Sequence, residues 1–519
     1  MSLTADIPAA PPPGSFRSVL DLLRAGAARH GGRTFLHSID QGTSVGWDAL
    51  YRFANRFARF CADRGIGPGD RIAVMTDNSL ENVVLYYAVM RAGATYCTVN
   101  VEIQSAHLKE MLSRLQPKLV LWDRTLDPEA LGVGAPGDWI PFGAFGSDDG
   151  GLFAAVDALP DAPELACTAA PDDLALISFT SGTSAKPKGV MHSFDDYQRI
   201  AEQTVAMWGL SEADRILEYR SFSWASSHML CLHPCLLSGA TLLFAKRFSQ
   251  SRFFDWVRDL KPTIAIGVPT VINMLLDRPV DVRTRQFGSL RFMSSSTAPL
   301  MLDQHRRFEE TYGIRLVQLY GMSEGGVVAG NSPETRRIGS VGRPGLYQNL
   351  RIVGEDGQKL PQGAVGEIEI GGAQNAFGYL LEDGTVQQIR GNRLKTGDLG
   401  YLDPDGFLYV TGRAKDLIIR GGVNIAPLEI DNLLMTHPDI AEAATVGVPD
   451  PIYGEAVVCY VAPKAGRALD AAAVQAHCAA ALPDFKRPKE IVFVETILKT
   501  DRGKVDRNGL VALWKQGRG

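Results

Sequence analysis

Residues 180–189 are the stretch from which the rest of the chain can be interpreted: Thr180-Ser181-Gly182-Thr183-Ser184-Ala185-Lys186-Pro187-Lys188-Gly189. They follow Leu174 to Phe179, an apolar run of strand length. The stretch combines glycines, hydroxyl side chains and two lysines. A polyphosphate needs such groups, because backbone and hydroxyl donors bind its oxygens and lysine offsets its charge. The stretch therefore predicts a phosphate-binding loop.

This loop differs from the usual P-loop. In that motif a Gly-Lys-Ser/Thr ending closes the loop, whereas here Lys188 precedes the closing Gly189. Taken alone, the stretch is also compatible with an exposed Ser/Gly/Lys turn, in which both lysines are only solvated. The rest of the chain decides between the two interpretations.

Size and charge place the chain among ordinary globular proteins. Its 519 residues predict two to four domains, and 45% hydrophobic and 21% charged residues are typical values. A net charge of -5 gives no electrostatic footprint for nucleic acid. No apolar run is long enough to span a bilayer, and the Ala/Pro-rich segment from Met1 to Phe16 lacks the pattern of a secretory signal. We expect a cytoplasmic protein with a loose N-terminal tail and no stable membrane insertion.

Cysteine usage favours reduced thiols. The chain has 7 cysteines, an odd number, scattered along its length. The cluster Cys231-Leu232-His233-Pro234-Cys235 could suggest zinc, but no second cysteine pair completes a four-ligand site. We interpret these cysteines as buried thiols and predict no metal there.

Apolar runs of strand length alternate with amphipathic, helix-like stretches through most of the chain, which predicts βαβ units around parallel sheets. The expected strands are 71–75, 94–99, 118–122, 174–179, 240–245, 263–268 and 291–294. The expected helices are 18–28, 47–64, 81–93, 253–260 and 271–276.

Three segments depart from this alternation. Residues 126–172 are rich in Gly, Asp, Ala and Pro and are expected to form a loop; they contain Gly132-x-Gly134-x-x-Gly137, which we interpret as a coincidental dinucleotide fingerprint. Residues 341–412 are rich in β-branched residues and glycine, which predicts a smaller β subdomain. From Leu417 a last segment carries its own strand and helix signals and is long enough for a small separate domain.

Four further motifs follow the loop in a fixed order. They are Gln318-Leu319-Tyr320-Gly321-Met322-Ser323-Glu324, Lys395-Thr396-Gly397-Asp398, Gly412-Arg413-Ala414-Lys415-Asp416 continued by Gly421-Gly422-Val423-Asn424-Ile425-Ala426-Pro427-Leu428-Glu429-Ile430, and Thr500-Asp501-Arg502-Gly503-Lys504-Val505-Asp506-Arg507. With the loop, this set resembles the adenylate-forming enzymes: acyl- and aryl-CoA synthetases, adenylation domains and luciferases. The resemblance covers residues 180–507, and within this family the chain is most similar to an acyl-CoA synthetase.

The resemblance implies an α/β fold in two domains. A large N-terminal domain of α/β sheets plus a small β subdomain would occupy residues 1–414. A small, mobile α+β C-terminal domain, acting as a lid, would occupy residues 415–519. Lys415 falls at the hinge position between them.

The resemblance also assigns an ATP site. The residues implied are Thr180, Ser181, Gly182, Thr183, Ser184, Lys186, Lys188, Tyr320, Gly321, Ser323, Asp398, Arg413 and Lys504. Tyr320 would stack on adenine, Asp398 would accept the ribose hydroxyls, and Arg413 would bind ribose or phosphate. Ser323 replaces the usual threonine, which keeps the hydroxyl and loses the methyl group. From the residues alone, Tyr320 could also be a core tyrosine, Asp398 a turn residue and Arg413 part of a surface ion pair.

The catalytic residues implied are Lys504, Glu324 and Thr183. Glu324 and Thr183 would hold Mg²⁺, which prefers few carboxylates together with phosphate oxygens. Lys504 would steady the carboxylate and the α-phosphate during adenylation. Rotation at the hinge would then remove it and bring Gly421 and Gly422 to line a tunnel for the CoA thiol.

The acid pocket is implied by weaker matches. Its candidates are Trp224, His228, Val268, Ser295, Ser296, Thr297 and Gly321. A buried core tryptophan remains an alternative for Trp224. Ser296-Thr297 stand where the family has Gly-Gly, so the added side chains narrow this wall. Arg220 could meet a second carboxylate of the substrate, although we favour a surface role for it.

The predicted function is therefore an acid–CoA ligase that uses ATP, Mg²⁺ and CoA to activate a short- or medium-chain acyl or aryl acid. A stand-alone adenylation enzyme that loads a carrier protein is the alternative, and a non-catalytic nucleotide-binding protein on this fold is a third interpretation. Retention of Glu324, Asp398 and Lys504 argues against the third. The expected partners are small molecules, with a homodimer left open.

Overall fold

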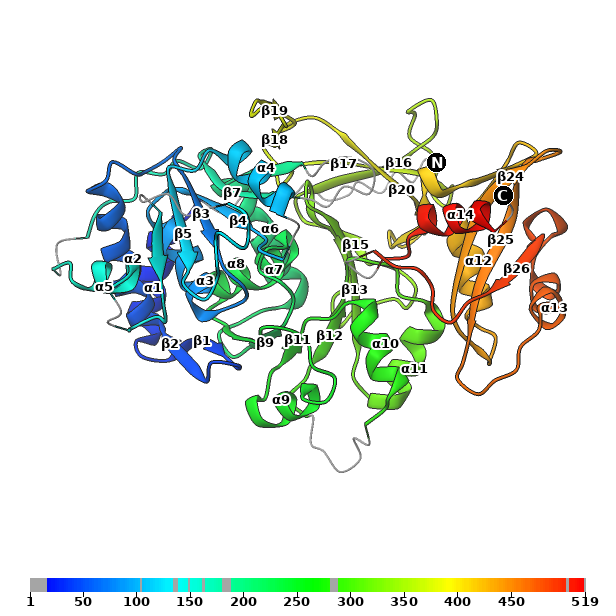
Figure 1. Ribbon diagram of the computed structural model, residues 1–519, viewed down its shortest axis with the longest axis horizontal. Helices are drawn as coiled ribbons and strands as arrows, with labels where there is room; N and C mark the ends of the chain where they lie inside the picture. The colour runs from blue at the N-terminus through cyan, green and yellow to red at the C-terminus, as the bar shows by residue number, and fades with distance from the viewer. Residues whose placement is uncertain are drawn as a thin grey trace, which may run out of the picture.

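The computed structural model describes residues 16–102, 105–133, 139–147, 150–160, 164–179, 188–280, 288–500 and 504–517. Two large sheets and a small antiparallel sheet precede a C-terminal sheet (Figure 1). The arrangement confirms the predicted α/β class, with a larger N-terminal and a smaller C-terminal part.

The first large sheet has the strand order β19-β18-β8-β7-β4-β3-β5-β6. Its strands are β3 (Arg71–Met75), β4 (Thr95–Val99), β5 (Leu119–Asp123), β6 (Ile140–Phe142), β7 (Leu174–Phe179), β8 (Gly189–Ser193), β18 (Gly378–Leu380) and β19 (Val386–Gln388). Strands β3 to β7 pair in parallel, while β8 runs antiparallel to β7. The segment between β7 and β8 is the predicted phosphate loop, so the sheet fixes both of its ends.

The second large sheet has the order β15-β14-β13-β12-β11-β9-β10-β1-β2. Its strands are β1 (Thr34–Ser38), β2 (Thr43–Gly46), β9 (Arg215–Glu218), β10 (Thr241–Phe244), β11 (Ile264–Ala265), β12 (Phe292–Ser295), β13 (Leu316–Met322), β14 (Gly326–Gly330) and β15 (Arg343–Pro344). Strands β9 to β13 are parallel. Their carboxyl ends therefore share one edge, the edge at which open α/β sheets bind ligands.

Helices pack on and between these sheets. They are α1 (Val19–His30), α2 (Trp47–Ala62), α3 (Leu80–Arg91), α4 (Ser105–Leu115), α5 (Leu152–Asp157), α6 (Phe194–Trp208), α7 (Ala225–Ser227), η1 (His228–Leu232, a π-helix), α8 (His233–Ser238), α9 (Phe253–Leu260), α10 (Pro269–Asp277) and α11 (Leu302–Tyr312). Every residue of α3 is buried. A helix that is apolar around its whole circumference belongs in a core, and α3 packs against α1, α2, β1 and β4.

Residues 341–412 form the predicted β subdomain only in part. Four strands make the small antiparallel sheet: β16 (Gln348–Val353), β17 (Gly366–Gly372), β20 (Leu394–Leu402) and β21 (Leu408–Arg413). The intervening β18 and β19 leave this sheet and join the first large sheet, where β18 pairs with β8. The β subdomain is thus tied to the strand that follows the phosphate loop.

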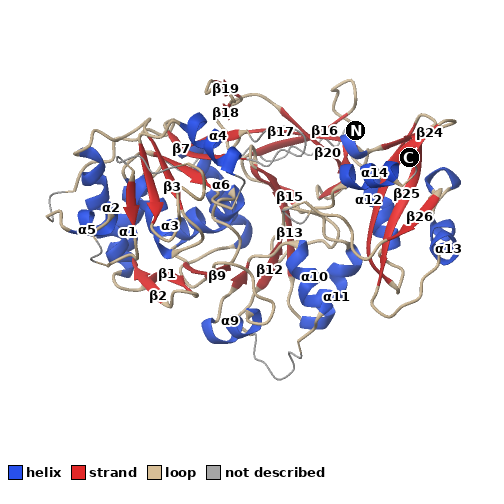
Figure 2. Cartoon of the chain, in the orientation of Figure 1, coloured by secondary structure: helices blue, strands red, loops and turns tan. Residues whose placement is uncertain are grey.

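The C-terminal sheet lies at the far end of the molecule (Figure 1). Its elements are η2 (Ala414–Asp416), β22 (Ile418–Arg420), β23 (Val423–Ile425), α12 (Pro427–Leu434), β24 (Ile440–Asp450), β25 (Gly454–Pro463), α13 (Ala471–Ala481), η3 (Asp484–Lys486), β26 (Glu490–Phe493) and α14 (Arg507–Gln516). Side chains of β25 alternate between two cores, as a strand's period of two requires. Val457 and Cys459 pack with Val474 of α13, whereas Val458 and Tyr460 pack with Leu510 of α14. Helices therefore cover both faces of this sheet (Figure 2).

Two expectations about secondary structure are wrong in part. Residues 126–172 contain strand β6 and helix α5 as well as loops. Phe153 of α5 is buried, and its ring lies tilted against Phe53 at 5.4 Å between centroids, so tertiary packing rather than local pattern forms this helix. The strand expected over 263–268 is only Ile264–Ala265. Of the coincidental Gly-x-Gly-x-x-Gly, Gly134 and Gly137 lie outside the described residues.

In the part of the chain that the structure describes, no helix combines the length and the apolar character needed to cross a bilayer.

Candidate active site

The phosphate loop enters the described structure only at its end. The predicted ligands Thr180, Ser181, Gly182, Thr183, Ser184 and Lys186 lie outside the described residues. Lys188 is described, directly before β8, and its Nζ lies 4.9 Å from the ring centroid of Tyr379. The last lysine of the loop is thus held over an aromatic face supplied by β18.

Glu324, the predicted metal ligand, lies in the turn between β13 and β14. Its Oε1 accepts a hydrogen bond of 2.9 Å from the Tyr379 hydroxyl, and its backbone carbonyl accepts one of 2.7 Å from Ala376 N. The preceding Ser323 carbonyl contacts Nε2 of His192 at 2.8 Å. Burial lowers the pKa of His192 to about 4, so this ring is neutral and donates from Nε2. The turn that carries Glu324 is therefore held to β8 by His192 and to β18 by Tyr379.

Tyr320, Asp398 and Arg413, three of the residues predicted to bind ATP, form one cluster. The Tyr320 hydroxyl donates to Asp398 Oδ2 at 2.6 Å, and Arg413 Nε donates to Asp398 Oδ1 at 2.9 Å. Asp398 and Arg413 are register partners on β20 and β21. Burial, with the Asp398 charge, raises the pKa of Tyr320 well above its ordinary value, which keeps the phenol protonated.

Gly321 occupies a site that no other residue fits. A Cβ atom at this position would lie 2.5 Å from the carbonyl oxygen of Gly326, on the facing strand of the β13–β14 hairpin. The close approach sets the turn that presents Tyr320 and Glu324. The sequence predicts Gly321 as a ligand-binding residue; its geometry also gives it a backbone role.

The predicted acid-pocket wall lies at the carboxyl end of β12. Ser295 and Ser296 are 2% and 3% exposed, and the hydroxyl of each has no hydrogen-bond partner among the described residues. Ser294, by contrast, accepts a bond of 3.2 Å from Gly267 N. Thr297 has a φ of 72°, rare for a threonine. Backbone strain at a sheet edge, next to unpartnered hydroxyls, is typical of a ligand-binding wall.

Val268, another predicted wall residue, directly precedes α10 and is half-buried. It follows β11, the neighbour of β12, so it lies at the same sheet edge as Ser295.

The predicted gate segment is more deeply buried than its sequence indicates. Trp224 is half-buried at the start of α7. His228 is fully buried, with its ring 5.0 Å from Tyr86 and 5.9 Å from Tyr96, and burial lowers its pKa to about 4. His228 also begins the π-helix, an irregularity found frequently at functional sites.

The surface role favoured for Arg220 is wrong. Arg220 is 4% exposed and forms a double hydrogen bond with Glu218, with the shortest contact at 2.6 Å. Glu218 is the last residue of β9, and Arg220 follows two residues beyond it. A guanidinium neutralised in this way is not available to a substrate carboxylate without breaking a buried ion pair.

The C-terminal candidates occupy two loops. Lys415 is exposed in η2, which joins β21 to β22. Gly421 and Gly422 form the turn between β22 and β23 with φ of 59° and 83°, and a Cβ at Gly422 would meet nothing within 4 Å. The carbonyl of Lys504 accepts a hydrogen bond of 2.8 Å from Thr500 N.

The residues present fit Mg²⁺ held mainly by phosphate. Among the described residues no group of three His, Cys, Asp or Glu side chains could hold a metal ion. A single carboxylate, Glu324, is what a magnesium ion bound to phosphates needs. In the segment considered for zinc, Cys231 and Cys235 are buried, and the Cys231 thiol donates to Glu218 at 3.1 Å.

Sequence reasoning missed Tyr379 and His192, which fasten the Glu324 turn. A three-residue strand such as β18 carries too little pattern to be placed in a sheet, and His192 is one buried residue of β8. No local signal could have identified either contact.

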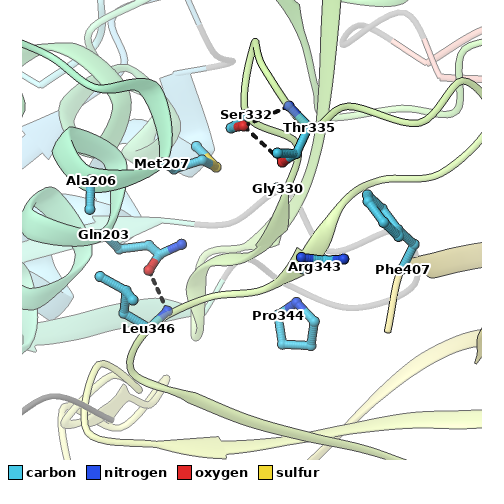
Figure 3. Close-up of a pocket in the computed structure, with 10 residues that line it drawn as sticks. All are labelled: Gln203, Ala206, Met207, Gly330, Ser332, Thr335, Arg343, Pro344, Leu346 and Phe407. Carbon is cyan, nitrogen blue, oxygen red and sulfur yellow. Dashed lines mark hydrogen bonds between the residues drawn. The ribbon is translucent and has the colours of Figure 1, made fainter. Parts of the chain in front are cut away.

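A separate hollow of about 190 Å³ lies between α6 and strands β14 and β15. Gln203, Met207, Gly330 and Arg343 line it, and Ser332 and Thr335 bond each other at its rim (Figure 3). None of the predicted site residues lines it.

Two family models match the chain. The model described as AMP-binding enzyme matches residues 23–380, and the model described as AMP-binding enzyme C-terminal domain matches residues 429–504. Among curated proteins, the sulfoacetate–CoA ligase of Cupriavidus necator is 34% identical over 504 residues, covering 95% of this chain and 97% of the relative. The oxalate–CoA ligase of Arabidopsis thaliana is 32% identical over 475 residues, covering 89% and 91%.

Solved structures agree with this similarity over nearly the whole length. ATP-bound MatB from Rhodopseudomonas palustris aligns with a TM-score of 0.85 at 27% identity, covering 96% of this chain and 100% of that one. The amide bond synthetase McbA from Marinactinospora thermotolerans aligns with a TM-score of 0.84 at 25% identity, covering 96% and 99%.

Proposed function

The chain belongs to the AMP-binding enzyme family and is an acid–CoA ligase, and we propose that the acid it activates is short and carries a second polar or anionic group. The end-to-end similarity to CoA ligases carries the assignment of the activity. The proposal about the acid is supported by the unpartnered hydroxyls at the end of β12.

The reaction has two halves. A carboxylate oxygen attacks the α-phosphorus of ATP, the bond to the β-phosphate breaks, and pyrophosphate leaves. The CoA sulfur then attacks the acyl carbon, the bond to AMP breaks, and the thiol proton passes to solvent. Mg²⁺, when bound, neutralises phosphate charge.

We propose that Tyr320, Asp398 and Arg413 bind the adenosine. An ionised carboxylate has about four lone-pair sites. Tyr320 and Arg413 each use one oxygen of Asp398, which leaves a site on each oxygen for a ribose hydroxyl. The cluster therefore supports ribose binding without first being taken apart. Lys188 and Lys504 are proposed for the phosphates, with Lys504 acting only in the first half-reaction.

We propose that the C-terminal part rotates about Lys415 between the two halves. The support is the exposed η2 segment at that residue and the open turn at Gly421 and Gly422. A turn with no side chains lets the pantetheine arm of CoA pass close to the backbone.

The buried hydroxyls of Ser295 and Ser296 support the proposal that the acid pocket takes a polar substrate. A buried hydroxyl with no partner costs about 1–3 kcal/mol relative to a bonded one. A carboxylate or sulfonate on the acid could accept from one of these hydroxyls and remove its cost. Arg220 is not part of the proposal, because Glu218 already neutralises it. Relatives named for sulfoacetate and oxalate agree in chemical type.

The test is pyrophosphate release and thioester formation across sulfoacetate, oxalate, malonate, hexanoate, benzoate and indoleacetate, with and without CoA. We expect the acids with a second anionic group to be preferred, with CoA converting the adenylate to thioester. A preference for hexanoate or benzoate would contradict the proposed acid. Adenylate that accumulates despite CoA would move the search to a carrier protein.

Variants sharpen the same test. Ser295→Ala and Ser296→Ala should lower the preference for anionic acids over hexanoate by about tenfold, the value of one charge-assisted hydrogen bond. Ser289→Ala is the matched control, because its buried hydroxyl also lacks a described partner but precedes β12.

We also propose that the enzyme acts in the cytoplasm. Light scattering on the purified chain tests the homodimer that the sequence left open.

A further inference from the structure

Tyr379 contacts two groups of the phosphate site that come from different segments. Its hydroxyl donates to Glu324 Oε1 at 2.9 Å, and the ammonium of Lys188 lies 4.9 Å from its ring centroid. No step of the proposed reaction requires Tyr379 to touch a substrate. Both residues that it contacts are candidates for binding the ATP phosphates or their metal.

The backbone fixes this contact. Strand β18 pairs antiparallel with β8, with Tyr379 opposite Val190 and Leu380 opposite Gly189. A Cβ at Gly189 would lie 3.1 Å from the Leu380 Cβ, so the strands approach closely where the phosphate loop ends. The Ala376 N–H donates a hydrogen bond to the Glu324 carbonyl. The segment that leads into β18 and Tyr379 is therefore held to the turn that carries Glu324 by a backbone hydrogen bond.

We infer that Tyr379 is a positioning residue, which orients the Glu324 carboxylate for Mg²⁺ and steadies Lys188 beside the phosphates. The inference deepens the proposed function and rests on Glu324 being the metal ligand. The hydroxyl occupies Oε1 and restricts the carboxylate's rotation, so Oε2 is presented in one orientation. The ring face attracts the lysine ammonium, which limits the volume that this flexible side chain samples.

Two variants of the full chain separate the two contacts. Tyr379→Phe removes the hydroxyl and keeps the ring, whereas Tyr379→Leu removes both. Calorimetry would measure the Kd for ATP in excess Mg²⁺ and in EDTA. For Tyr379→Phe we expect a roughly tenfold weaker Kd with Mg²⁺, because a hydrogen bond to a charged group is lost. In EDTA we expect less than a twofold change, because no metal then depends on the orientation of Glu324. For Tyr379→Leu we expect affinity to fall in EDTA as well.

The chain offers a matched control in Tyr347. The Tyr347 hydroxyl donates to Glu202 at 2.7 Å, and Arg199 lies 5.3 Å from its ring centroid. This tyrosine has the same pair of contacts, away from the predicted site residues. Tyr347→Phe should leave both ATP affinities within twofold of the unmodified chain, even where it lowers the melting temperature equally.

A double-mutant cycle with Glu324→Gln completes the test. If Tyr379 acts through Glu324, the losses in Mg²⁺-dependent affinity should be non-additive, because the second change removes nothing further. Additive losses, or a Tyr379→Phe variant that matches Tyr347→Phe in every Mg²⁺ titration, would overturn the inference. Higher Mg²⁺ should restore the turnover of Tyr379→Phe.

The binding assay separates this inference from the proposed function. An unmodified chain that binds MgATP but makes no thioester from any acid would contradict the proposed function and still test Tyr379. An unmodified chain whose affinity for ATP is the same with and without Mg²⁺ would overturn the role of Tyr379.

Discussion

Tyr320 donates a hydrogen bond of 2.6 Å to Asp398, and this contact joins two different sheets. Tyr320 lies on β13 of the second large sheet, and Asp398 lies on β20 of the small antiparallel sheet. Arg413 holds the other oxygen of Asp398 from β21. The proposed adenosine site is therefore assembled before any nucleotide binds, which reduces the entropy lost when the reactants are positioned.

Replacing Asp398 should weaken ATP binding. Asp398→Ala removes the acceptor proposed for the ribose hydroxyls and leaves Tyr320 and Arg413 without it. We expect the KM for ATP to rise roughly 10- to 100-fold, the value of about 1.5–3 kcal/mol for hydrogen bonds to a charged group. Initial rates at varied ATP would measure this. Asp403→Ala is the control, because Asp403 is also 9% exposed and paired with an arginine, Arg337. Equal KM increases in both variants would contradict a ribose role.

Replacing Lys504 should separate the two half-reactions. Lys504→Ala should slow acid-dependent pyrophosphate release by about 10²- to 10³-fold, as expected when a group that stabilises developing charge is lost. Thioester formation from a synthetic acyl-adenylate and CoA should remain within about threefold of the unmodified rate, since the lysine is proposed for the first half only.

Lys499→Ala is the control for Lys504. Lys499 pairs with Val505, the residue after Lys504, in an isolated antiparallel bridge, and it forms an ion pair with Glu442. If the two variants slow pyrophosphate release equally, the effect belongs to the bridge between Lys499 and Val505 and not to the Lys504 side chain.

A side chain at Gly422 should obstruct CoA. Gly422 has a φ of 83° with open space around its missing Cβ, so Gly422→Leu costs about 1–2 kcal/mol of backbone strain but meets no neighbour. We expect normal pyrophosphate release and a slower thioester step. Gly466→Leu carries the same strain, because Gly466 has a φ of 73° and open surroundings elsewhere in the C-terminal part. A thioester rate reduced equally by Gly466→Leu would exclude a tunnel at Gly422.

Acid should destabilise the N-terminal sheets through three buried histidines. Burial lowers the pKa of His192, His228 and His233 to about 4, below the unfolded value near 6.5. Their contribution to stability is therefore complete above pH 6.5 and is lost as the pH falls from 6.5 towards 4. At pH 5 each of these histidines lowers the free energy of unfolding by about 2 kcal/mol relative to pH 7.

Asp196 opposes this trend, because burial raises its pKa to about 6 and its protonation favours the folded state as the pH falls. Asp431 of the C-terminal part acts in the same direction, because burial raises its pKa to about 6 as well. Each aspartate offsets about 1.3 kcal/mol between pH 7 and pH 5, so the three histidines still outweigh the two aspartates. The melting temperature should fall between pH 7 and pH 5, and His233→Gln should reduce that fall by roughly half, because the aspartates offset part of the histidine total. An unchanged pH dependence in His233→Gln would contradict the account.

The sequence allows much of the fold to be predicted because strong patterns are local. The run Leu174–Phe179 is a strand with the expected bounds, and the helices expected over 253–260 and 271–276 form. The sequence does not predict helix α5, because its six residues are too few to show a helical pattern. Leu152, Phe153 and Val156 are held in the helix by packing against the core. The buried pair Glu218 and Arg220 had no strand pattern to reveal it, because β9 ends at Glu218 and Arg220 lies two residues beyond that end.

The site could be predicted less completely than the fold. Tyr320, Asp398 and Arg413 were named from motifs, and the structure brings them together. Tyr379 could not be named, because its partners Glu324 and Lys188 are distant in sequence and β18 is only three residues long. Contacts of this kind depend on strand pairing across the chain, which no local pattern encodes.

The pairing of β8 with β18 has a consequence for how the protein is made on the ribosome. Val190 emerges long before its partner Tyr379. At roughly 5–20 residues per second, β8 waits about 10–40 s for the strand that completes its edge. Until then Lys188 and Glu324 lack Tyr379, the residue that contacts them both. A nascent chain stopped before β18 would carry the nucleotide motif without the nucleotide site, so competence to bind ATP arrives late in synthesis.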